Sequence, residues 1–170
     1  MAVRMIWAET RDRVIGAGGG IPWHLPGEQA MFKQRTAGST VVMGRATWDS
    51  LPARVRPLPG RRNVVLSRDP GWAADGAETV RSVDEVLARY DDFWVIGGAA
   101  VYAVFVPFAD LVVRTEIDLE VAGDTFAPAL GDEWEATPEE WQIASNGVKF
   151  RVVQLHRARP HAEKSVTAVR

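Results

Sequence analysis

Short apolar runs of strand length alternate along the chain with segments that carry helix signals. Strands are predicted at residues 3–8, 40–43, 63–67, 93–96 and 111–117, each rich in β-branched or other apolar side chains. Helices are predicted at residues 27–36, 44–50, 83–90 and 99–106. This alternation predicts parallel strands joined by crossover helices, because such a connection packs each helix back onto the sheet.

Specific residues mark several of the predicted boundaries. Ser82 and Glu85 have the spacing of a capping box, and Pro107 should end the helix that precedes it. Asn146-Gly147 lies between two apolar segments and is the strongest hairpin signal in the chain. We therefore expect a single α/β domain over residues 1–158, with a mostly parallel central sheet, a C-terminal antiparallel hairpin at its edge and about four flanking helices. Residues 159–170 are polar and are expected to form a flexible tail.

Composition changes this picture little but excludes several classes of function. The chain has 170 residues, 46% hydrophobic and 25% charged, which is ordinary for one globular domain with a sizeable core. A net charge of −2 indicates no general affinity for nucleic acid or for an anionic membrane, so neither is expected as a partner. The N-terminal residues show no signal-peptide pattern.

The sequence also argues against disulfides and against a metal site. The chain has no cysteine, which excludes thiolate ligands and fits a reducing compartment, so we expect a cytoplasmic protein. His24, His156 and His161 lie far apart and show no metal-ligand spacing, so no metal is predicted.

The first candidate site is the stretch from Gly16 to Lys33, where a glycine-rich segment meets a proline-stiffened one. Its glycines permit a mobile lid, and the prolines on either side of Trp23 fix the backbone there. Glu28 follows in the first turn of a helix, with apolar side chains three and four residues later on the same face. Such an arrangement suits a flat, polar-edged heterocycle. Taken alone, Glu28 is better explained as an ordinary first-turn acid that stabilises its helix.

The second candidate site consists of two strand–glycine–helix junctions, at residues 44–47 and 97–100. Backbone amides at a helix start can bind phosphate oxygens, although tight packing explains either junction alone about as well. Arg45 and Arg68 would each follow a strand on the same side of the sheet, where ligands collect in α/β folds. A pair of guanidinium groups suits the monophosphate that distinguishes NADPH from NADH. Taken singly, each arginine is better explained as a surface residue.

In their order and spacing these segments resemble the dihydrofolate reductase family, in its bacterial chromosomal form, over about Val3 to Arg157. The matching segments are VIG at 14–16, IPWHLP at 21–26, MGRATWDSLP at 43–52, PLPGRRNVVLSR at 57–68, WVIGGAAVY at 94–102, TEID at 115–118 and GDT at 123–125. The stretch ARVRPLPGRRNVVLSR is similar to actinobacterial members.

The resemblance implies an oxidoreductase that reduces 7,8-dihydrofolate to 5,6,7,8-tetrahydrofolate with NADPH, for one-carbon metabolism and thymidylate synthesis. It also implies a monomer and an antifolate target. A pyrimidine reductase of riboflavin synthesis on the same fold and a non-catalytic NADPH-binding module are the alternatives. The first would not need the acid at position 28 together with Phe32 and Arg61.

The resemblance further assigns site residues. Glu28 would bind the amidine-like edge of the pterin and support protonation of its imine nitrogen, with Thr115 as its hydroxyl partner and Trp23 as a third catalytic residue. The other substrate contacts implied are Ile6, Trp7, Ala8, Phe32, Leu51, Leu58, Arg61, Ile96 and Tyr102, where Arg61 would pair with the carboxylate of the substrate's glutamate. The cofactor contacts implied are Ala8, Ile15, Gly16, Ile21, Gly44, Arg45, Ala46, Thr47, Leu66, Ser67, Arg68, Ile96, Gly97, Gly98, Ala99, Ala100, Val101 and Tyr102.

Three departures from the family pattern stand near these residues. The acid at position 28 is Glu where many bacterial members have Asp, and Ala99 replaces the third glycine of the family's glycine loop. Gln29 and Met31 alter the polarity and shape beside the acid. None removes a required group, so the resemblance implies that activity is retained, whereas antifolate affinity could differ.

Overall fold

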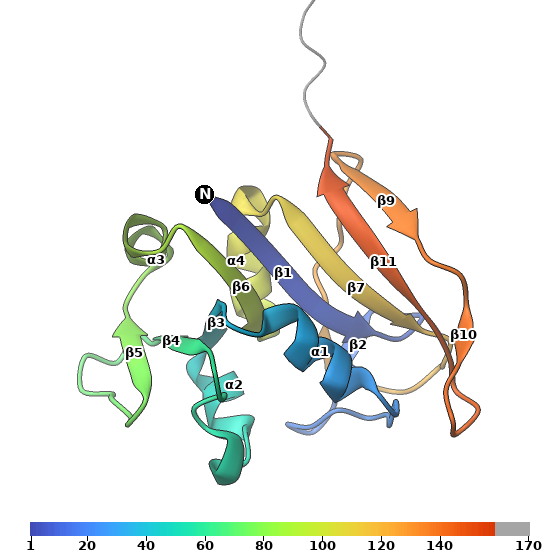
Figure 1. Ribbon diagram of the computed structural model, residues 1–170, viewed down its shortest axis with the longest axis horizontal. Helices are drawn as coiled ribbons and strands as arrows, with labels where there is room; N and C mark the ends of the chain where they lie inside the picture. The colour runs from blue at the N-terminus through green and yellow to red at the C-terminus, as the bar shows by residue number, and fades with distance from the viewer. Residues whose placement is uncertain (159–170) are drawn as a thin grey trace, which may run out of the picture.

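A nine-stranded sheet in the order β10-β11-β7-β1-β6-β3-β4-β5, with β9 paired to β11, forms the centre of the protein (Figure 1). The computed structural model describes residues 1–158. The predicted tail, residues 159–170, lies outside the described residues. The strands are β1 (Ala2–Glu9), β2 (Val14–Gly16), β3 (Thr40–Gly44), β4 (Arg62–Leu66), β5 (Ala77–Val80), β6 (Asp92–Gly97), β7 (Leu111–Ile117), β8 (Thr125–Phe126), β9 (Trp134–Pro138), β10 (Gln142–Ile143) and β11 (Lys149–Arg157). The α-helices are α1 (Glu28–Thr36), α2 (Arg45–Ser50), α3 (Val83–Arg89) and α4 (Ala99–Phe105), and two 3₁₀ turns span Ala53–Val55 and Val106–Phe108.

Six neighbouring strands, β7, β1, β6, β3, β4 and β5, run parallel, as the alternation of strands and helices predicted. β1 lies between β7 and β6, near the centre of the whole sheet, with Ala2 opposite Asp92 of β6 and Arg4 opposite Leu111 of β7. β11 joins the sheet antiparallel to β7. The Asn146-Gly147 hairpin is confirmed, because the backbone of Ala144 bonds to that of Val148 across it.

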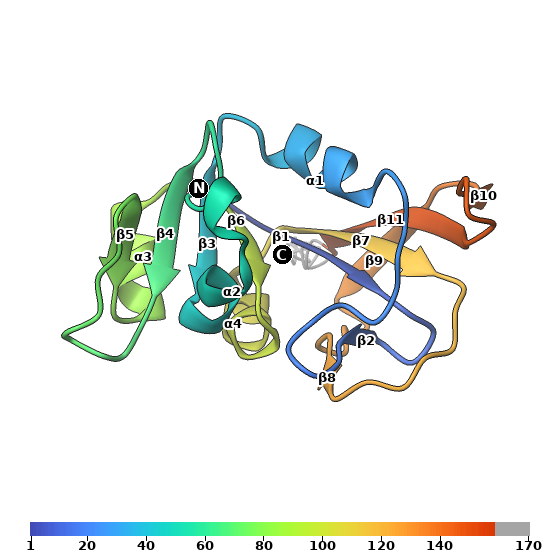
Figure 2. The ribbon, with the colours of Figure 1, turned by 90° about the horizontal axis from the view of Figure 1, so that it is seen from below.

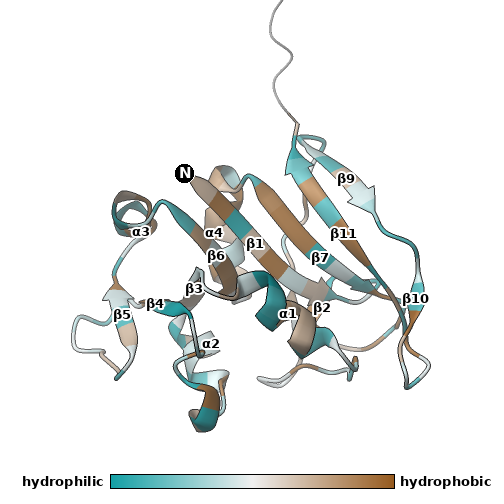
Figure 3. Ribbon diagram, viewed as in Figure 1, coloured by the Kyte–Doolittle hydropathy of each residue, from teal (hydrophilic) through white to brown (hydrophobic). Residues whose placement is uncertain are grey.

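Helices cover both faces of the sheet. α3 and α4 lie on one face and α1 on the other, as the view from below shows (Figure 2). Val86, Tyr102 and Phe105 of α3 and α4 belong to one buried cluster, together with Met5 of β1. On the opposite face, Ile6 and the buried Trp48 of α2 belong to a second cluster. Because successive side chains of a strand point to opposite faces, neighbouring residues of β1 such as Met5 and Ile6 belong to two separate cores. The central strands are hydrophobic over most of their length, whereas β9 is not (Figure 3).

The structure differs from the sequence prediction at short or polar elements. β2, β5, β8 and β9 were not predicted, and β2 pairs with β8 in a separate two-stranded sheet. The helix predicted to end at Val106 also ends one residue earlier. α4 ends at Phe105, and Pro107 lies inside a following 3₁₀ turn, where its fixed φ is tolerated.

The predicted capping box at the start of α3 is half formed. Ser82 Oγ accepts a hydrogen bond from the amide of Glu85 at 3.1 Å. The Glu85 carboxylate accepts from the amide of Arg81, one residue before the expected donor, at 2.7 Å.

Within residues 1–158, no helix has both the length and the apolar character needed to cross a membrane.

Candidate active site

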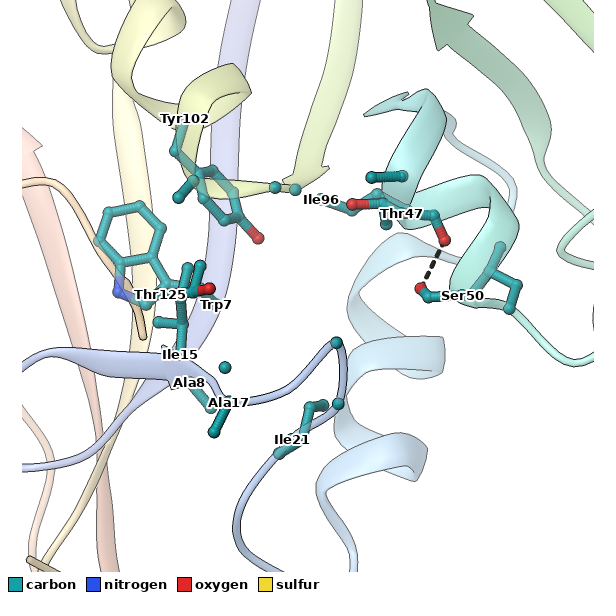
Figure 4. Close-up of a pocket in the computed structure, with 18 of the residues that line it drawn as sticks. Trp7, Ala8, Ile15, Ala17, Ile21, Thr47, Ser50, Ile96, Tyr102 and Thr125 are labelled. Carbon is teal, nitrogen blue, oxygen red and sulfur yellow. Dashed lines mark hydrogen bonds between the residues drawn. The ribbon is translucent and has the colours of Figure 1, made fainter. Parts of the chain in front are cut away.

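A cleft of about 740 Å³ opens at the carboxyl ends of β1 and β6, between α1, α2, α4 and the segment that follows β2 (Figure 4). Its walls are mostly apolar, with a few polar groups that converge on it. The lining residues are Ile6, Trp7, Ala8, Ile15, Gly16, Ala17, Gly19, Gly20, Ile21, Trp23, Glu28, Gln29, Ala46, Thr47, Ser50, Leu51, Pro52, Ile96, Gly97, Gly98, Ala99, Tyr102 and Thr125. A large apolar cavity with a few polar groups is typical of a small-molecule site.

A smaller cavity of about 60 Å³ lies between α1 and the sheet. It is lined by Ile6, Trp7, Ala8, Glu28, Met31, Phe32, Arg35, Val113, Thr115 and Val152. The first four of these residues also line the cleft, so the two spaces share a wall. Glu28 therefore stands between an open cleft and an apolar recess.

The carboxylate of Glu28 is held by an indole from the cleft rim. Trp23 Nε1 donates a hydrogen bond to Glu28 Oε2 at 3.2 Å. Burial raises the pKa of Glu28, while the Trp23 hydrogen bond and the charge of His24 act in the opposite direction. A raised pKa in a cleft is a marker of a functional acid. Thr115 shares the small cavity with Glu28, although no hydrogen bond joins the two side chains in the described part of the chain.

The lid predicted at the glycine-rich segment is a tight turn anchored at both ends. Ala17 and Gly20 exchange two backbone hydrogen bonds of 2.9 and 3.0 Å, and the intervening Gly18 and Gly19 have φ of 58° and 81°. Asp124 Oδ2 accepts from the amide of Gly18 at 3.0 Å, and the Asp124 amide bonds to Gly16. The turn therefore projects over the cleft from the β2–β8 sheet.

Tyr102 and Trp7 form the wall at the sheet side of the cleft. The Tyr102 hydroxyl donates to the carbonyl oxygen of Ile6 at 2.6 Å, and its ring centroid lies 5.0 Å from that of Trp7. Burial raises the pKa of Tyr102, so its hydroxyl stays neutral and serves as a donor. Trp7 and Tyr102 are both buried.

The Gly97–Gly98 pair gives a flat surface beside α2. The peptide bond between them is cis. A Cβ atom on Gly97 would lie 3.2 Å from Thr47 Oγ1, and one on Gly98 would lie 3.5 Å from the same atom. Both glycines therefore present bare backbone to the cleft, which fits the close approach of a dinucleotide.

Part of the predicted cofactor set lies outside the two cavities. These residues are Gly44, Arg45, Leu66, Ser67, Arg68, Ala100 and Val101. Leu66 and Val101 pack against the core, and the Ser67 hydroxyl accepts from the amide of Asp69 at 3.3 Å.

Arg45 and Arg68 come to neighbouring strand ends, since Gly44 of β3 is opposite Leu66 of β4. The Arg45 guanidinium lies 3.6 Å from Asp49 and 3.7 Å from Asp69. Arg68 is exposed, and its side chain has no hydrogen bond or ion pair among residues 1–158. The two arginines thus present positive charge on one surface, with Arg45 already partly neutralised.

The side chain of Arg81 holds the loop that carries Arg68. The Arg81 guanidinium donates to the carbonyl oxygens of Ser67, Asp69 and Pro70 at 3.3, 2.6 and 3.0 Å. Three such bonds from one planar group determine the path of the loop.

Two predicted substrate contacts, Leu58 and Arg61, do not line either cavity. They lie at the carboxyl end of α1, where Arg61 donates to Thr36 Oγ1 at 3.0 Å and its guanidinium is 5.8 Å from the Phe32 ring centroid. Burial lowers the pKa of Arg61, but the side chain remains a cation. Leu58 is buried in the cluster that contains Phe32. Arg61 therefore does not line the recess itself but lies over Phe32, which does.

The sequence-based site omitted several lining residues. Thr125 lies in the GDT segment, so that motif could have indicated it. Val113 and Val152 share a sheet face with Thr115, because Val152 is opposite Thr115 and Val113 is two residues before it. The others are Ala17, Gly19, Gly20, Gln29, Met31, Arg35, Ser50 and Pro52.

Comparison with known proteins gives one consistent result. A family model described as dihydrofolate reductase matches residues 2–157. The chain is 50% identical over 159 residues to a dihydrofolate reductase of Mycobacterium tuberculosis, which covers 92% of this chain and 98% of that protein. It is 44% identical over 162 residues to the dihydrofolate reductase of Mycobacterium leprae, with 92% and 98% covered.

A solved structure is similar in the same way. It is a dihydrofolate reductase from Enterococcus faecalis complexed with NADP(H) and RAB-propyl, and it superposes with a TM-score of 0.83 at 34% sequence identity. The match covers 93% of this chain and 97% of that chain.

Proposed function

The chain belongs to the dihydrofolate reductase family, and on that premise we propose that its cleft reduces 7,8-dihydrofolate to 5,6,7,8-tetrahydrofolate with NADPH. The observation that carries the proposal is the placement of Glu28. Its half-buried carboxylate stands between an apolar recess, sized for part of a ring, and a cleft sized for a larger ligand.

NADPH, when bound, supplies the hydride. The glycines 97 and 98, with Ala46, Thr47 and Ala99, would accommodate its phosphates, and Ile15, Ile96 and Tyr102 would form the wall beside its ring. Arg45 and Arg68 would bind the monophosphate that distinguishes NADPH from NADH, since guanidinium groups pair well with phosphate oxygens.

Glu28 would orient the substrate and support its protonation. An ionised carboxylate accepts hydrogen bonds from an amidine-like ring edge, and its negative charge raises the proton affinity of a nearby imine nitrogen. The proton need not come from Glu28 itself, because a water molecule that passes the lid can deliver it. The Trp23 hydrogen bond favours the ionised form and fixes the orientation of the carboxylate. Closure of the lid would then exclude bulk water.

The remaining substrate contacts fit a ligand that extends from the recess toward the surface. Phe32 and Thr115 line the recess, and Leu51 lines the cleft. Arg61, held by Thr36 over Phe32, would pair with the glutamate carboxylate of the substrate. The riboflavin-pathway alternative is not favoured, since the family model and the relatives described above are dihydrofolate reductases.

The deciding experiment follows NADPH oxidation by absorbance, with and without dihydrofolate. We expect oxidation that depends on dihydrofolate, that is poor with NADH and that is largely lost in Glu28→Gln. NADPH binding without dihydrofolate-dependent oxidation would refute the substrate assignment while leaving the fold and cofactor assignments in place.

We also propose a cytoplasmic monomer with residues 1–158 as its catalytic unit. The absence of cysteine fits a reducing compartment. The resemblance to the dihydrofolate reductase family favours a monomer. Sedimentation of the purified protein at a mass near 18.7 kDa would support the monomer, and turnover by a chain ending at Ala158 would support the boundary.

A further inference from the structure

A group of charged side chains lies behind the wall of the cleft, where none would be expected to contact a ligand. Glu9 of β1 is 5% exposed, and its Oε1 lies 3.4 Å from Nε of Arg114 on β7. Arg114 also approaches Glu116 at 3.4 Å, and Glu116 accepts a hydrogen bond from Arg151 of β11 at 2.8 Å. The register places Glu9 opposite Glu116 and Glu116 opposite Arg151. The ion pairs therefore form one series, Glu9–Arg114–Glu116–Arg151, in which the sign of the charge alternates and which spans three adjacent strands.

One hydrogen bond connects this ionic group to the cleft. Trp7 Nε1 donates to Glu9 Oε1 at 2.9 Å, and both groups are buried. Trp7 lines the cleft, so a rotation of its ring would alter the cleft wall. On its other side, the ring packs against Tyr102, whose hydroxyl holds the carbonyl of Ile6. The connection thus runs from Glu9 through Trp7 and Tyr102 to the backbone between the two cavities.

The indole of Trp7 depends on Glu9 for its orientation. A buried indole N–H without an acceptor costs free energy, so the ring adopts the orientation in which its nitrogen reaches an acceptor. Within residues 1–158, the Trp7 nitrogen has Glu9 as its hydrogen-bond acceptor. The guanidinium of Arg114 helps to hold the Glu9 carboxylate in place, because Oε1 of Glu9 faces both the Trp7 indole and the Arg114 guanidinium.

We propose that Glu9 is a positioning residue for the hydride-transfer reaction, because it holds the Trp7 ring at the wall of the cleft. The inference rests on the proposed function and deepens it. Glu9 contacts no ligand in this account. Its effect is on the geometry in which cofactor and substrate meet, where small displacements have large effects on rate.

Four variants separate this role from a general contribution to stability. Glu9→Gln retains an oxygen that accepts from Trp7, whereas Glu9→Ala removes it. Glu9→Asp keeps the charge for Arg114 but withdraws the oxygen by one methylene, which guards against a failure of Glu9→Ala to fold. Glu116→Gln is the matched control, because it removes a charge from the same group without contacting Trp7.

The measurement is single-turnover hydride transfer from NADPH to dihydrofolate, together with the Kd of each ligand. We expect Glu9→Ala and Glu9→Asp to slow hydride transfer about tenfold or more, with smaller changes in Kd. Glu9→Gln and Glu116→Gln should remain within about threefold of the wild type. Wild-type hydride transfer in Glu9→Asp, or an equal loss in Glu116→Gln, would overturn the proposal.

A second readout does not require activity. The Trp7 indole N–H, assigned by NMR with a Trp7→Phe variant, should be protected from hydrogen exchange in the wild type and in Glu9→Gln. It should exchange faster in Glu9→Asp. Equal protection in all three would refute the hydrogen bond. If the wild type does not turn over dihydrofolate, the proposed function fails, and this exchange experiment still tests the positioning of Trp7.

Discussion

Trp23 at the rim of the cleft donates a hydrogen bond to Glu28, the acid that separates the cleft from the recess. The same hydrogen bond opposes the effect of burial on the pKa of Glu28. The rim residue therefore influences both where the carboxylate points and whether it carries a charge.

Trp23→Phe should raise the pKa of Glu28. The substitution keeps the aromatic ring but removes the N–H that stabilises the ionised form. A carboxyl ¹³C titration by NMR measures the change directly. Trp141→Phe is the control, because Trp141 is exposed beside β10 and does not line the cleft. An unchanged or lower pKa of Glu28 in Trp23→Phe would refute the role of the indole.

Glu28→Gln should stabilise the protein at neutral pH while it removes activity. Burial raises the folded-state pKa of Glu28 above 4.5, so the folded protein binds the proton more tightly than the unfolded chain does. Well below pH 4.5, Glu28 is neutral in both the folded protein and the unfolded chain, so its ionisation does not lower the free energy of unfolding. As the pH rises through the raised pKa, the wild type loses stability because a buried group becomes charged.

The gain in Tm of Glu28→Gln over the wild type should therefore grow from pH 4.5 upward and then level off above the folded pKa. Thermal unfolding at a series of pH values provides the test. A constant difference across that range would show that the burial of Glu28 does not shift its ionisation.

Arg68→Ala should weaken NADPH binding about tenfold or more and leave NADH binding nearly unchanged, because a charge-assisted bond to phosphate is worth about 1.5–3 kcal/mol. Arg45→Ala should act in the same direction but less strongly, since Asp49 and Asp69 already engage this guanidinium. The ratio of the KM for NADH to that for NADPH is the measurement. Arg54→Ala, an exposed residue in the 3₁₀ turn after α2, controls for the loss of one charge. Equal effects on both cofactors would contradict the phosphate contact.

Gly44→Ala should destabilise the fold by about 1–3 kcal/mol through overpacking. A Cβ atom at this position would lie 3.0 Å from Cγ2 of Val101 on α4. Val101→Ala removes that methyl group, so Gly44→Ala should cost less in the Val101→Ala background. Urea denaturation of the four proteins in this double-mutant cycle measures the coupling. If the two substitutions change the free energy of unfolding additively, the destabilisation by Gly44→Ala does not arise from its contact with Val101.

The sequence was sufficient for the central sheet and insufficient for its margins. The strand at residues 63–67 could be predicted because its apolar side chains are buried on both faces. β9 is exposed from Glu135 onward and pairs only with β11 among the described strands, so no apolar pattern marks it. β2 and β8 have three and two residues and pair across more than a hundred positions of sequence. No local signal predicts such a pairing.

The same distinction applies to the site. Glu28 and Thr115 could be proposed from motif order, and the structure brings both to one cavity. The contact of Asp69 with Arg45 and the ionic group behind Trp7 could not. Asp69 reaches Arg45 through the loop after β4, and Glu9 meets Arg114 only because of the register between β1 and β7. Strand register is determined by the whole sheet and is not readable from either segment alone.

The central place of β1 has a consequence for synthesis of the chain on the ribosome. β1 is made first, yet both of its sheet neighbours, β6 and β7, begin at residues 92 and 111. A nascent chain therefore carries an apolar strand with two unpaired edges until most of the protein has been translated. Such a strand is prone to intermolecular pairing, so the emerging polypeptide is a natural client for a chaperone that shields exposed hydrophobic segments.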